Sequence, residues 1–125
     1  MKKIIIYVLF ILVLLLISCS SSKEISPKEA YEMMNRGDCT LIDLSKPPTY
    51  KDGHIKNAIL IEFHPNTFKK EISAIDRSKP IIIYCGTGKK TTKAVSVMKD
   101  LGFKGFYIIS GGLRAWKEAG FQVVK

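Results

Sequence analysis

The sequence lacks several features that would define a function. Its three cysteines, Cys19, Cys39 and Cys85, do not have the paired spacing of a zinc site. No apolar run reaches the roughly 20 residues of a membrane-spanning helix, and there is no internal repeat. Acidic residues number only 11 against 20 basic ones, but no nucleic-acid-binding motif accompanies this charge. We therefore expect no metal site, no cofactor and no nucleic-acid partner.

The amino terminus has the pattern of a secretion signal. A short basic segment, residues 1–3, precedes fourteen apolar residues, 4–17, and a core of about 7–15 apolar residues is typical of a signal peptide. The sequence Leu16-Ile17-Ser18-Cys19 then resembles the lipobox of bacterial lipoproteins. We expect residues 1–18 to be a lipoprotein signal peptide and Cys19 to carry palmitate or similar acyl chains. An ordinary signal peptide with an incidental Cys19 is the alternative.

Removal of residues 1–18 would leave a basic chain of 107 residues. It keeps 18 basic and 11 acidic residues, a net charge of +7. Residues 19–24 are predicted to form a lipid-anchored polar tether, and residues 25–125 one domain with a modest core. Two or more acyl chains give stable anchoring, so we expect the domain to be bound to the extracytoplasmic side of a bacterial membrane. We also expect it to be a monomer. The lysines could attract anionic headgroups or small anions, although a solvated face is the simpler interpretation.

Cys85 is the strongest candidate for a reactive group. It directly follows the apolar run 80–84, which predicts a buried strand, and it precedes a glycine-rich loop and a predicted helix over 91–101. Backbone N–H groups, a helix N-terminus and the charges of Lys89 and Lys90 would all favour its thiolate. A buried structural thiol is the alternative.

The remaining pattern alternates strands and helices. Short apolar runs without polar alternation predict a parallel sheet with helices on both faces. Predicted strands cover 40–44, 58–62, 81–84 and 106–109; predicted helices begin near Ser26 and Thr91, with others around 68–75 and 113–119; residues 45–52 are predicted as a loop.

Asp43 and Cys39 can also be placed on the predicted sheet. Asp43 lies near a strand end, either as a site residue or, as we favour, as an acceptor for loop N–H groups. Cys39 precedes its strand whereas Cys85 follows its own, so they should lie at opposite edges and form no disulfide.

Four motifs together resemble a single-domain rhodanese, a thiosulfate sulfurtransferase-like domain. They occur in the family's order and cover residues 25–125: Leu41-Ile42-Asp43, the segment 50–55 (YKDGHI), the loop 84–88 (YCGTG), and Gly111-Gly112 with Trp116 and Gly120. The resemblance implies an α/β domain in which Cys85 accepts sulfur as a persulfide from a small sulfur-containing anion and passes it to a thiol or cyanide-like acceptor. It also implies a substrate-binding loop made of Gly86, Thr87, Gly88, Lys89, Lys90 and Thr91.

The chain departs from the family pattern at four positions. Ser45 and Thr49 replace an Arg and a Glu that are often present, and loss of both avoids leaving one charge unpaired. Gly86 and Lys90 stand where many members have Arg. Lysine keeps the charge but cannot grip an oxyanion in two places, so thiosulfate binding is expected to be weak.

Two further questions concern His54 and the reaction class. His54 could act as a base, but a thiolate needs none, so a supporting structural role is the preferred interpretation. A membrane-anchored sulfurtransferase is the favoured function, and a non-catalytic binding or sulfur-sensing module is the alternative. A cysteine phosphatase is disfavoured because Thr91 occupies the position six residues after Cys85, where such loops have Arg.

Overall fold

The computed structural model describes residues 1–17 and 22–125. Helix α1 spans Lys2–Ile17. Among the described residues, no helix combines the length and apolar character needed to cross a bilayer. The predicted lipidation site, Cys19, lies outside the described residues.

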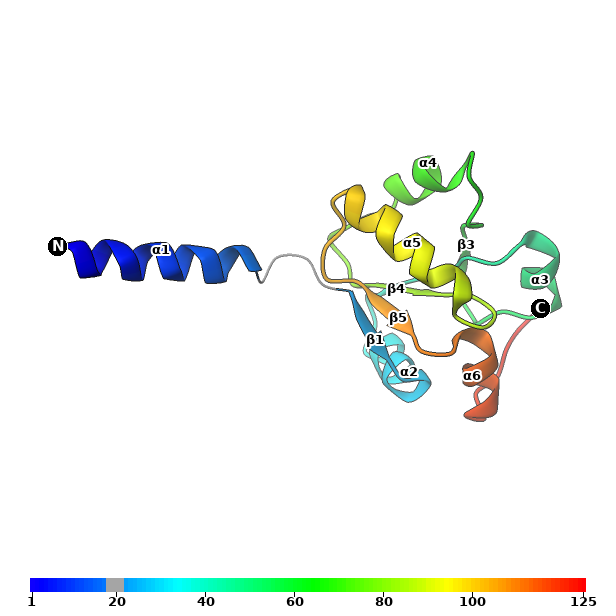
Figure 1. Ribbon diagram of the computed structural model, residues 1–125. Coiled ribbons are helices and arrows are strands. Elements are labelled where there is room, and N and C mark those ends of the chain that lie inside the picture. Colours follow the sequence, from blue (N-terminus) through cyan, green and yellow to red (C-terminus); the bar gives the residue numbers. More distant parts are fainter. Residues whose placement is uncertain (18–21) are drawn as a thin grey trace.

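A five-stranded sheet forms the centre of the domain, with the strand order β1-β5-β4-β2-β3 (Figure 1). Every neighbouring pair is parallel, which confirms the α/β class. The bounds of the strands are Lys23–Ile25 for β1, Thr40–Asp43 for β2, Ile59–Leu60 for β3, Ile81–Tyr84 for β4 and Tyr107–Ile109 for β5.

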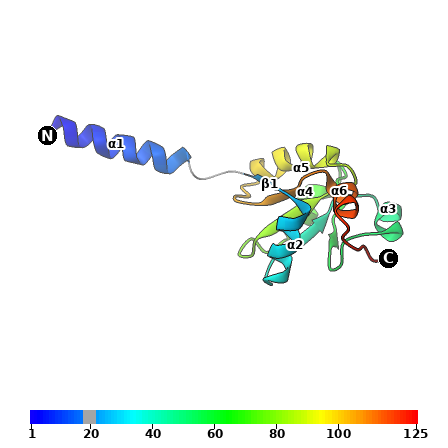
Figure 2. The same cartoon turned by 90° about the horizontal axis from the view of Figure 1, so that it is seen from below.

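Helices cover both faces of the sheet, as predicted. One core contains apolar residues of α4 and α5, and the other contains residues of α2 and α6. Figure 2 shows α5 and α2 on opposite sides of the strands. The bounds are Pro27–Asn35 for α2, Pro47–Asp52 for α3, Phe68–Ser73 for α4, Lys89–Asp100 for α5 and Gly112–Glu118 for α6.

Local sequence signals explain where α2 begins. Ser26 accepts a hydrogen bond from the Glu29 amide at 3.1 Å, and its hydroxyl donates to the Glu29 carboxylate at 3.3 Å. Pro27 occupies the first turn, where a missing N–H costs nothing. This capping pattern is the one the sequence predicts.

The sequence prediction was wrong in two segments. Lys23 and Glu24 belong to strand β1, not to a tether, so the domain begins before residue 25. Only Ile25 of this strand is buried, so the sequence of the strand has no apolar pattern that would predict it. The strand is held by its backbone pairing with β5. Helix α3 lies within the predicted loop 45–52, because two prolines are tolerated in a first helical turn.

Two other elements have boundaries that differ from the predicted ones by one or two residues. Helix α5 begins at Lys89, two residues before the predicted start at Thr91. Strand β3 covers only Ile59–Leu60 of the predicted 58–62.

Cys39 and Cys85 are both free, and the sheet register explains why. Thr40 is paired with Ile81, and Asp43 with Tyr84. Cys39 therefore lies before the start of this strand pair and Cys85 after its end. A separation of five positions at about 3.3 Å each far exceeds the roughly 7 Å that a disulfide allows. The predicted separation of the two thiols is confirmed.

The protonation of Cys39 supplies a testable difference. Partial burial, with a smaller contribution from the negative charge of Asp38, raises the pKa of the Cys39 thiol, while a backbone hydrogen bond opposes this shift. A raised pKa means that less thiolate is present in the folded chain at a given pH. In a Cys85→Ser background at pH 8–9, we expect iodoacetamide to alkylate Cys39 more slowly in the folded protein than in urea. Equal rates, with Cys19 distinguished by peptide mapping, would contradict this.

Candidate functional site

Strand β4 places Cys85 at the carboxyl end of the sheet. All four residues of β4 are buried. Side chains alternate along a strand, and Cys85 lies with Ile81 and Ile83 in the core beneath α4 and α5. Only 2% of Cys85 is exposed. The thiol is therefore held at a strand end with little freedom, where open α/β sheets carry their sites.

The loop after Cys85 turns a backbone amide onto the sulfur. The Gly88 N–H donates to Cys85 Sγ at a donor–acceptor distance of 3.0 Å. Gly88 has a φ of +92° and caps the start of α5; this left-handed conformation favours glycine. Thr91 is buried, and its hydroxyl donates to the Gly88 carbonyl. Thr91 thus supports the loop and presents no charge to the sulfur.

Two other loop amides are available to a ligand. Within the described residues, the N–H groups of Gly86 and Thr87 donate to no backbone acceptor. Together with the Gly88 amide they can stabilise negative charge on a sulfur bound to Cys85. Of the predicted amide cradle, the Gly88 N–H is the one that donates to the sulfur among the described residues.

Helix α6 fixes the other side of this loop. The amide of Leu113 donates to the Cys85 carbonyl at 2.8 Å, and that of Arg114 donates to the Gly86 carbonyl at 3.0 Å. These bonds satisfy two carbonyl groups of the cysteine loop and hold the loop against α6. The close approach requires Gly112, because a Cβ there would lie 2.1 Å from the Cys85 carbonyl oxygen. The sequence indicated a turn at Gly111-Gly112 but not this contact.

A cavity of about 260 Å³ opens beside the thiol, and we call it the thiol cavity. It contains the predicted cysteine and four of the six predicted loop residues. Its lining consists of Ser45, Thr49, Cys85, Gly86, Thr87, Lys89 and Lys90. Lys89 and Lys90 make its only formal charges, both positive. Ser45 and Thr49, which replace the charged pair often found in the family, line it with hydroxyl groups.

Asp43 holds Ser45, one of the residues that line the thiol cavity. Its carboxylate oxygen Oδ1 accepts hydrogen bonds from the amide of Ser45, at 2.8 Å, and from the Ser45 hydroxyl. Asp43 is buried and does not line the thiol cavity. The favoured interpretation, an acceptor for loop N–H groups, is confirmed.

Tyr84 occupies the buried position beside Asp43. Its hydroxyl oxygen accepts a hydrogen bond from the Ile55 amide at 3.1 Å. Burial, followed by the neighbouring charge of Asp43, strongly raises the pKa of Tyr84. The phenol is therefore neutral and joins β4 to the segment that follows α3.

His54 has a structural environment. Its Nδ1 atom hydrogen-bonds the Tyr50 carbonyl at 2.8 Å, and its ring stacks on Tyr50 with centroids 3.7 Å apart. Its backbone forms a bridge with Val124. His54 does not line the thiol cavity, so it supports α3 and the carboxyl-terminal segment as the structural interpretation predicted.

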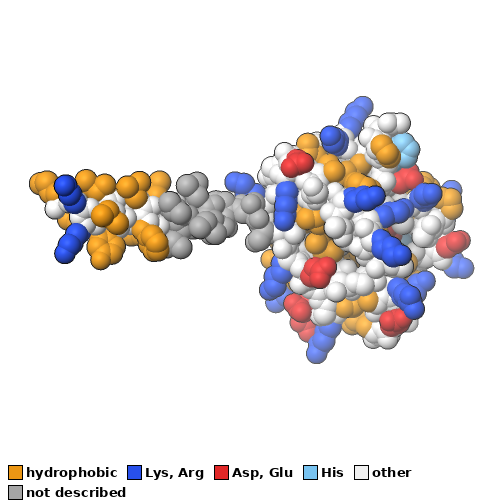
Figure 3. Space-filling view, in the orientation of Figure 1, with side chains coloured by type: hydrophobic (Ala, Val, Ile, Leu, Met, Phe, Trp, Pro, Cys, Tyr) orange, Lys and Arg blue, Asp and Glu red, His pale blue; other side chains and the backbone are white. Residues whose placement is uncertain are grey.

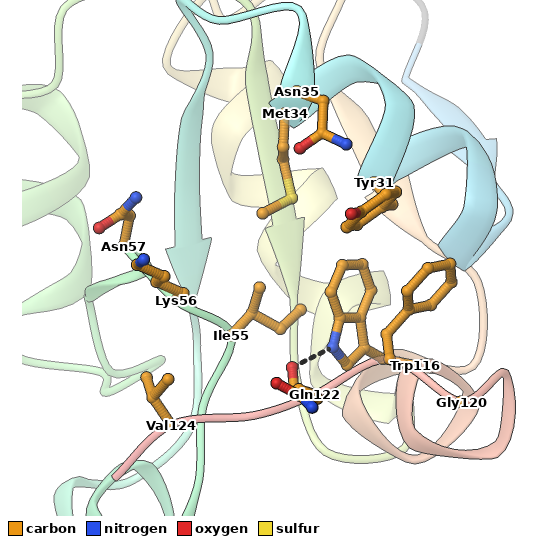
Figure 4. Close-up of a pocket in the computed structure, with 11 residues that line it drawn as sticks. Tyr31, Met34, Asn35, Ile55, Lys56, Asn57, Trp116, Gly120, Gln122 and Val124 are labelled. Carbon is orange, nitrogen blue, oxygen red and sulfur yellow. Dashed lines mark hydrogen bonds between the residues drawn. The ribbon is translucent and has the colours of Figure 1, made fainter.

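A second, larger cavity of about 580 Å³ lies between α2, the carboxyl end of α6 and the segment around Ile55 (Figure 4). Tyr31, Trp116 and Phe121 form an aromatic cluster on its wall. The Trp116 Nε1–H already donates to the Gln122 carbonyl at 2.9 Å. This cavity contains no cysteine, histidine or carboxylate. Nucleophilic chemistry therefore points to the smaller thiol cavity.

Positive charge surrounds the face that carries α4 and α5. Figure 3 shows many Lys and Arg side chains on this face and fewer acidic ones. The exposed lysines include Lys69 and Lys70 of α4 and Lys89 and Lys93 of α5. Such a field favours the approach of small anions to the thiol cavity.

Comparison with known proteins decides the family. Residues 26–119 match the family model described as "Rhodanese-like domain". This chain belongs to the rhodanese-like domain family. The match covers nearly the whole region in which the sequence resemblance to rhodanese was found.

Three relatives illustrate the range of this rhodanese-like family. A protein of Coxiella burnetii named "Thiosulfate sulfurtransferase GlpE" is 28% identical over 95 residues, 76% of this chain and 87% of that one. A "tRNA uridine(34) hydroxylase" of Chlamydia caviae is 29% identical, but the match covers 80% of this chain and only 32% of the hydroxylase. The crystal structure of a rhodanese-related protein from Thermoplasma volcanium gives a TM-score of 0.71 at 25% identity, covering 82% and 97% of the two chains.

These relatives support sulfur transfer in general terms. The single-domain relative is named as a sulfurtransferase, whereas in the hydroxylase the matching region is part of a longer chain. Membership of the rhodanese-like family therefore does not specify the sulfur donor, the acceptor or the reacting residue of this chain. The geometry of the thiol cavity is the basis for proposing them.

Proposed function

We propose that this protein is a membrane-anchored sulfurtransferase that carries sulfane sulfur as a persulfide on Cys85. The observation that carries the proposal is the amide of Gly88 at 3.0 Å from the Sγ atom of Cys85, a residue that lines a cavity whose charged lining residues, Lys89 and Lys90, are both positive. An N–H donor and nearby cations stabilise a thiolate and, after reaction, a charged outer sulfur.

The chemistry requires two displacement steps. The Cys85 thiolate attacks the outer sulfur of a donor such as thiosulfate; its S–S bond breaks, and sulfite leaves with the electron pair. Cys85 then holds one extra sulfur as a persulfide anion. An acceptor thiolate or cyanide attacks that sulfur, the new S–S bond breaks, and the Cys85 thiolate returns. No redox partner is needed, because the two steps leave the protein unchanged.

The same cavity supports a preference for compact anionic donors. Its volume of about 260 Å³ is small, and Lys89 and Lys90 bring positive charge to its lining. The proposed function is tested by adding thiosulfate and cyanide to the purified protein and measuring thiocyanate. Thiocyanate formation that saturates with donor supports catalysis, whereas no formation with thiosulfate or polysulfide would favour the sulfur-sensing alternative.

Lys90 offers a test of donor binding. We expect Lys90→Arg to lower the KM for thiosulfate by up to about tenfold, because a guanidinium can form two charge-assisted hydrogen bonds where lysine is a point charge. Lys93→Arg is the matched control, since Lys93 is exposed on the same helix and does not line the thiol cavity. An unchanged KM in a folded Lys90→Arg protein would show that this side chain does not face the donor.

Membrane anchoring rests on the sequence pattern that ends at Cys19. We expect Cys19→Ala to abolish incorporation of labelled fatty acid and to block normal removal of residues 1–18. Cys39→Ala is the control and should leave both unchanged. Mature protein that still contained residues 1–17 would contradict the anchoring proposal.

A further inference from the structure

The parallel sheet gives the domain two distinct ends. All five strands run in the same direction, so their amino ends share one edge of the sheet and their carboxyl ends share the opposite edge. The chain enters the sheet at Lys23, the first residue of β1 and therefore at the amino edge. The thiol cavity begins at Cys85, directly after β4, at the carboxyl edge.

The proposed lipid would hold the amino edge close to the bilayer. Four residue steps separate Cys19 from Lys23. An extended chain spans at most about 3.6 Å per residue, so this connection reaches no more than about 14 Å. Lys23 is also fixed to the sheet, because its amide donates to the Phe106 carbonyl at 3.0 Å. The anchor therefore cannot pass around the domain to its other end.

Loops at the amino edge form a surface that an anionic bilayer can approach. We call it the amino-end surface and define it as Lys23 with residues 36–38, 76–79 and 104–105. These positions are exposed and carry five basic and two acidic side chains. One acidic group, Asp38, is already paired with Lys79 at 3.9 Å. Net positive charge near the anchor is attracted to anionic headgroups.

The thiol cavity lies far from this surface. Helix α5 starts beside the cavity at Lys89 and runs back to Asp100, and twelve helical residues cover about 18 Å. Figure 1 shows the start of α5 and helices α3 and α6 toward one end of the domain, with the start of β1 toward the other. The cavity cannot reach the headgroups while the amino-end surface occupies them.

We propose that the amino-end surface lies against anionic phospholipid headgroups and that the thiol cavity opens away from the membrane, toward water-soluble sulfur donors and acceptors. This orientation rests on the anchoring at Cys19 proposed above. Charge alone does not select it, since Lys46, Lys51 and Lys89 make the carboxyl end basic as well. The short connection to β1 selects it.

Energy transfer from one dye to labelled lipids tests the orientation without relying on activity. Single labelling sites are Lys104→Cys on the amino-end surface and Lys51→Cys on α3, both exposed lysines, in full-length lipidated protein that also carries Cys39→Ser and Cys85→Ser. Vesicles contain phosphatidylethanolamine, phosphatidylglycerol and an acceptor-labelled lipid. We expect stronger transfer from position 104, because the two edges are separated by about one strand length, roughly 15 Å.

A lengthened tether is the matched control. Twenty Gly/Ser residues inserted after Ser22 span about 25 Å on average and would let the domain turn, so the difference between the two positions should shrink. Equal transfer from the two sites in the native-length chain, or stronger transfer from position 51, would overturn the orientation. If the protein did not float with the vesicles in a density gradient, the anchoring proposal would be contradicted, and so would this inference. Loss of sulfur transfer in the unlabelled protein would count only against the persulfide chemistry.

Discussion

Cys85→Ser is expected to reduce cyanide-dependent thiocyanate release by at least about 10³-fold, the scale observed when a covalent nucleophile is removed. The serine hydroxyl is similar in shape but is a far weaker nucleophile than a thiolate at neutral pH. Cys85 lies at the end of a fully buried strand with its Sγ bonded by the Gly88 amide. Serine can accept the same hydrogen bond, so the fold should be retained.

Cys39→Ser is the control for this experiment. Cys39 lies at the opposite edge of the sheet and outside the thiol cavity, so the variant should keep near-normal turnover. Circular dichroism and thermal unfolding should show that both variants are folded. Thiocyanate release that persisted in folded Cys85→Ser would remove Cys85 from the reaction.

Among Gly→Ala substitutions in this domain, Gly112→Ala is expected to lower the free energy of unfolding the most. The new Cβ would lie 2.1 Å from the Cys85 carbonyl oxygen, at a residue whose φ is +63°. Relief of that clash would break the two bonds from α6 to the Cys85 and Gly86 carbonyls. We expect a loss of about 3–4 kcal/mol in the free energy of unfolding, from backbone strain of about 1–2 kcal/mol and about 1 kcal/mol for each bond.

Gly105→Ala separates backbone strain from the clash. Gly105 has a nearly equal φ of +65°, but an added Cβ there would meet no atom within 4 Å. It should therefore lose only about 1–2 kcal/mol and keep its sulfur-transfer rate. Urea denaturation of the two variants measures the difference. An equal loss of unfolding free energy in the two variants would show that the close contact between Gly112 and the cysteine loop does not contribute to stability.

The sequence predicted the parts of the fold that depend on burial. Strand β4 and the thiol that follows it were identifiable because four consecutive apolar residues precede a cysteine and a glycine-rich loop. Helix α2 was identifiable from its Ser26 cap, since capping is a local interaction. The parallel arrangement followed from strands that lack polar alternation.

The remaining features depend on contacts between distant segments. Strand β1 is largely polar and exists through backbone bonds to β5, more than eighty residues away in sequence. The fixing of the cysteine loop by the amides of Leu113 and Arg114 joins residues that no local pattern connects. The role of Ser45 and Thr49 as cavity walls likewise required the folded positions of α3 and the loop after β4.

Mass spectrometry of the intact protein after exposure to thiosulfate or polysulfide tests the central claim most directly. The account predicts a gain of one sulfur atom, mapped by peptide analysis to Cys85 and removed by cyanide with release of thiocyanate. Cys39 should remain unmodified, and Cys85→Ser should gain no sulfur. An unmodified Cys85 in folded protein after both donors, or sulfur found only on Cys39, would contradict the account.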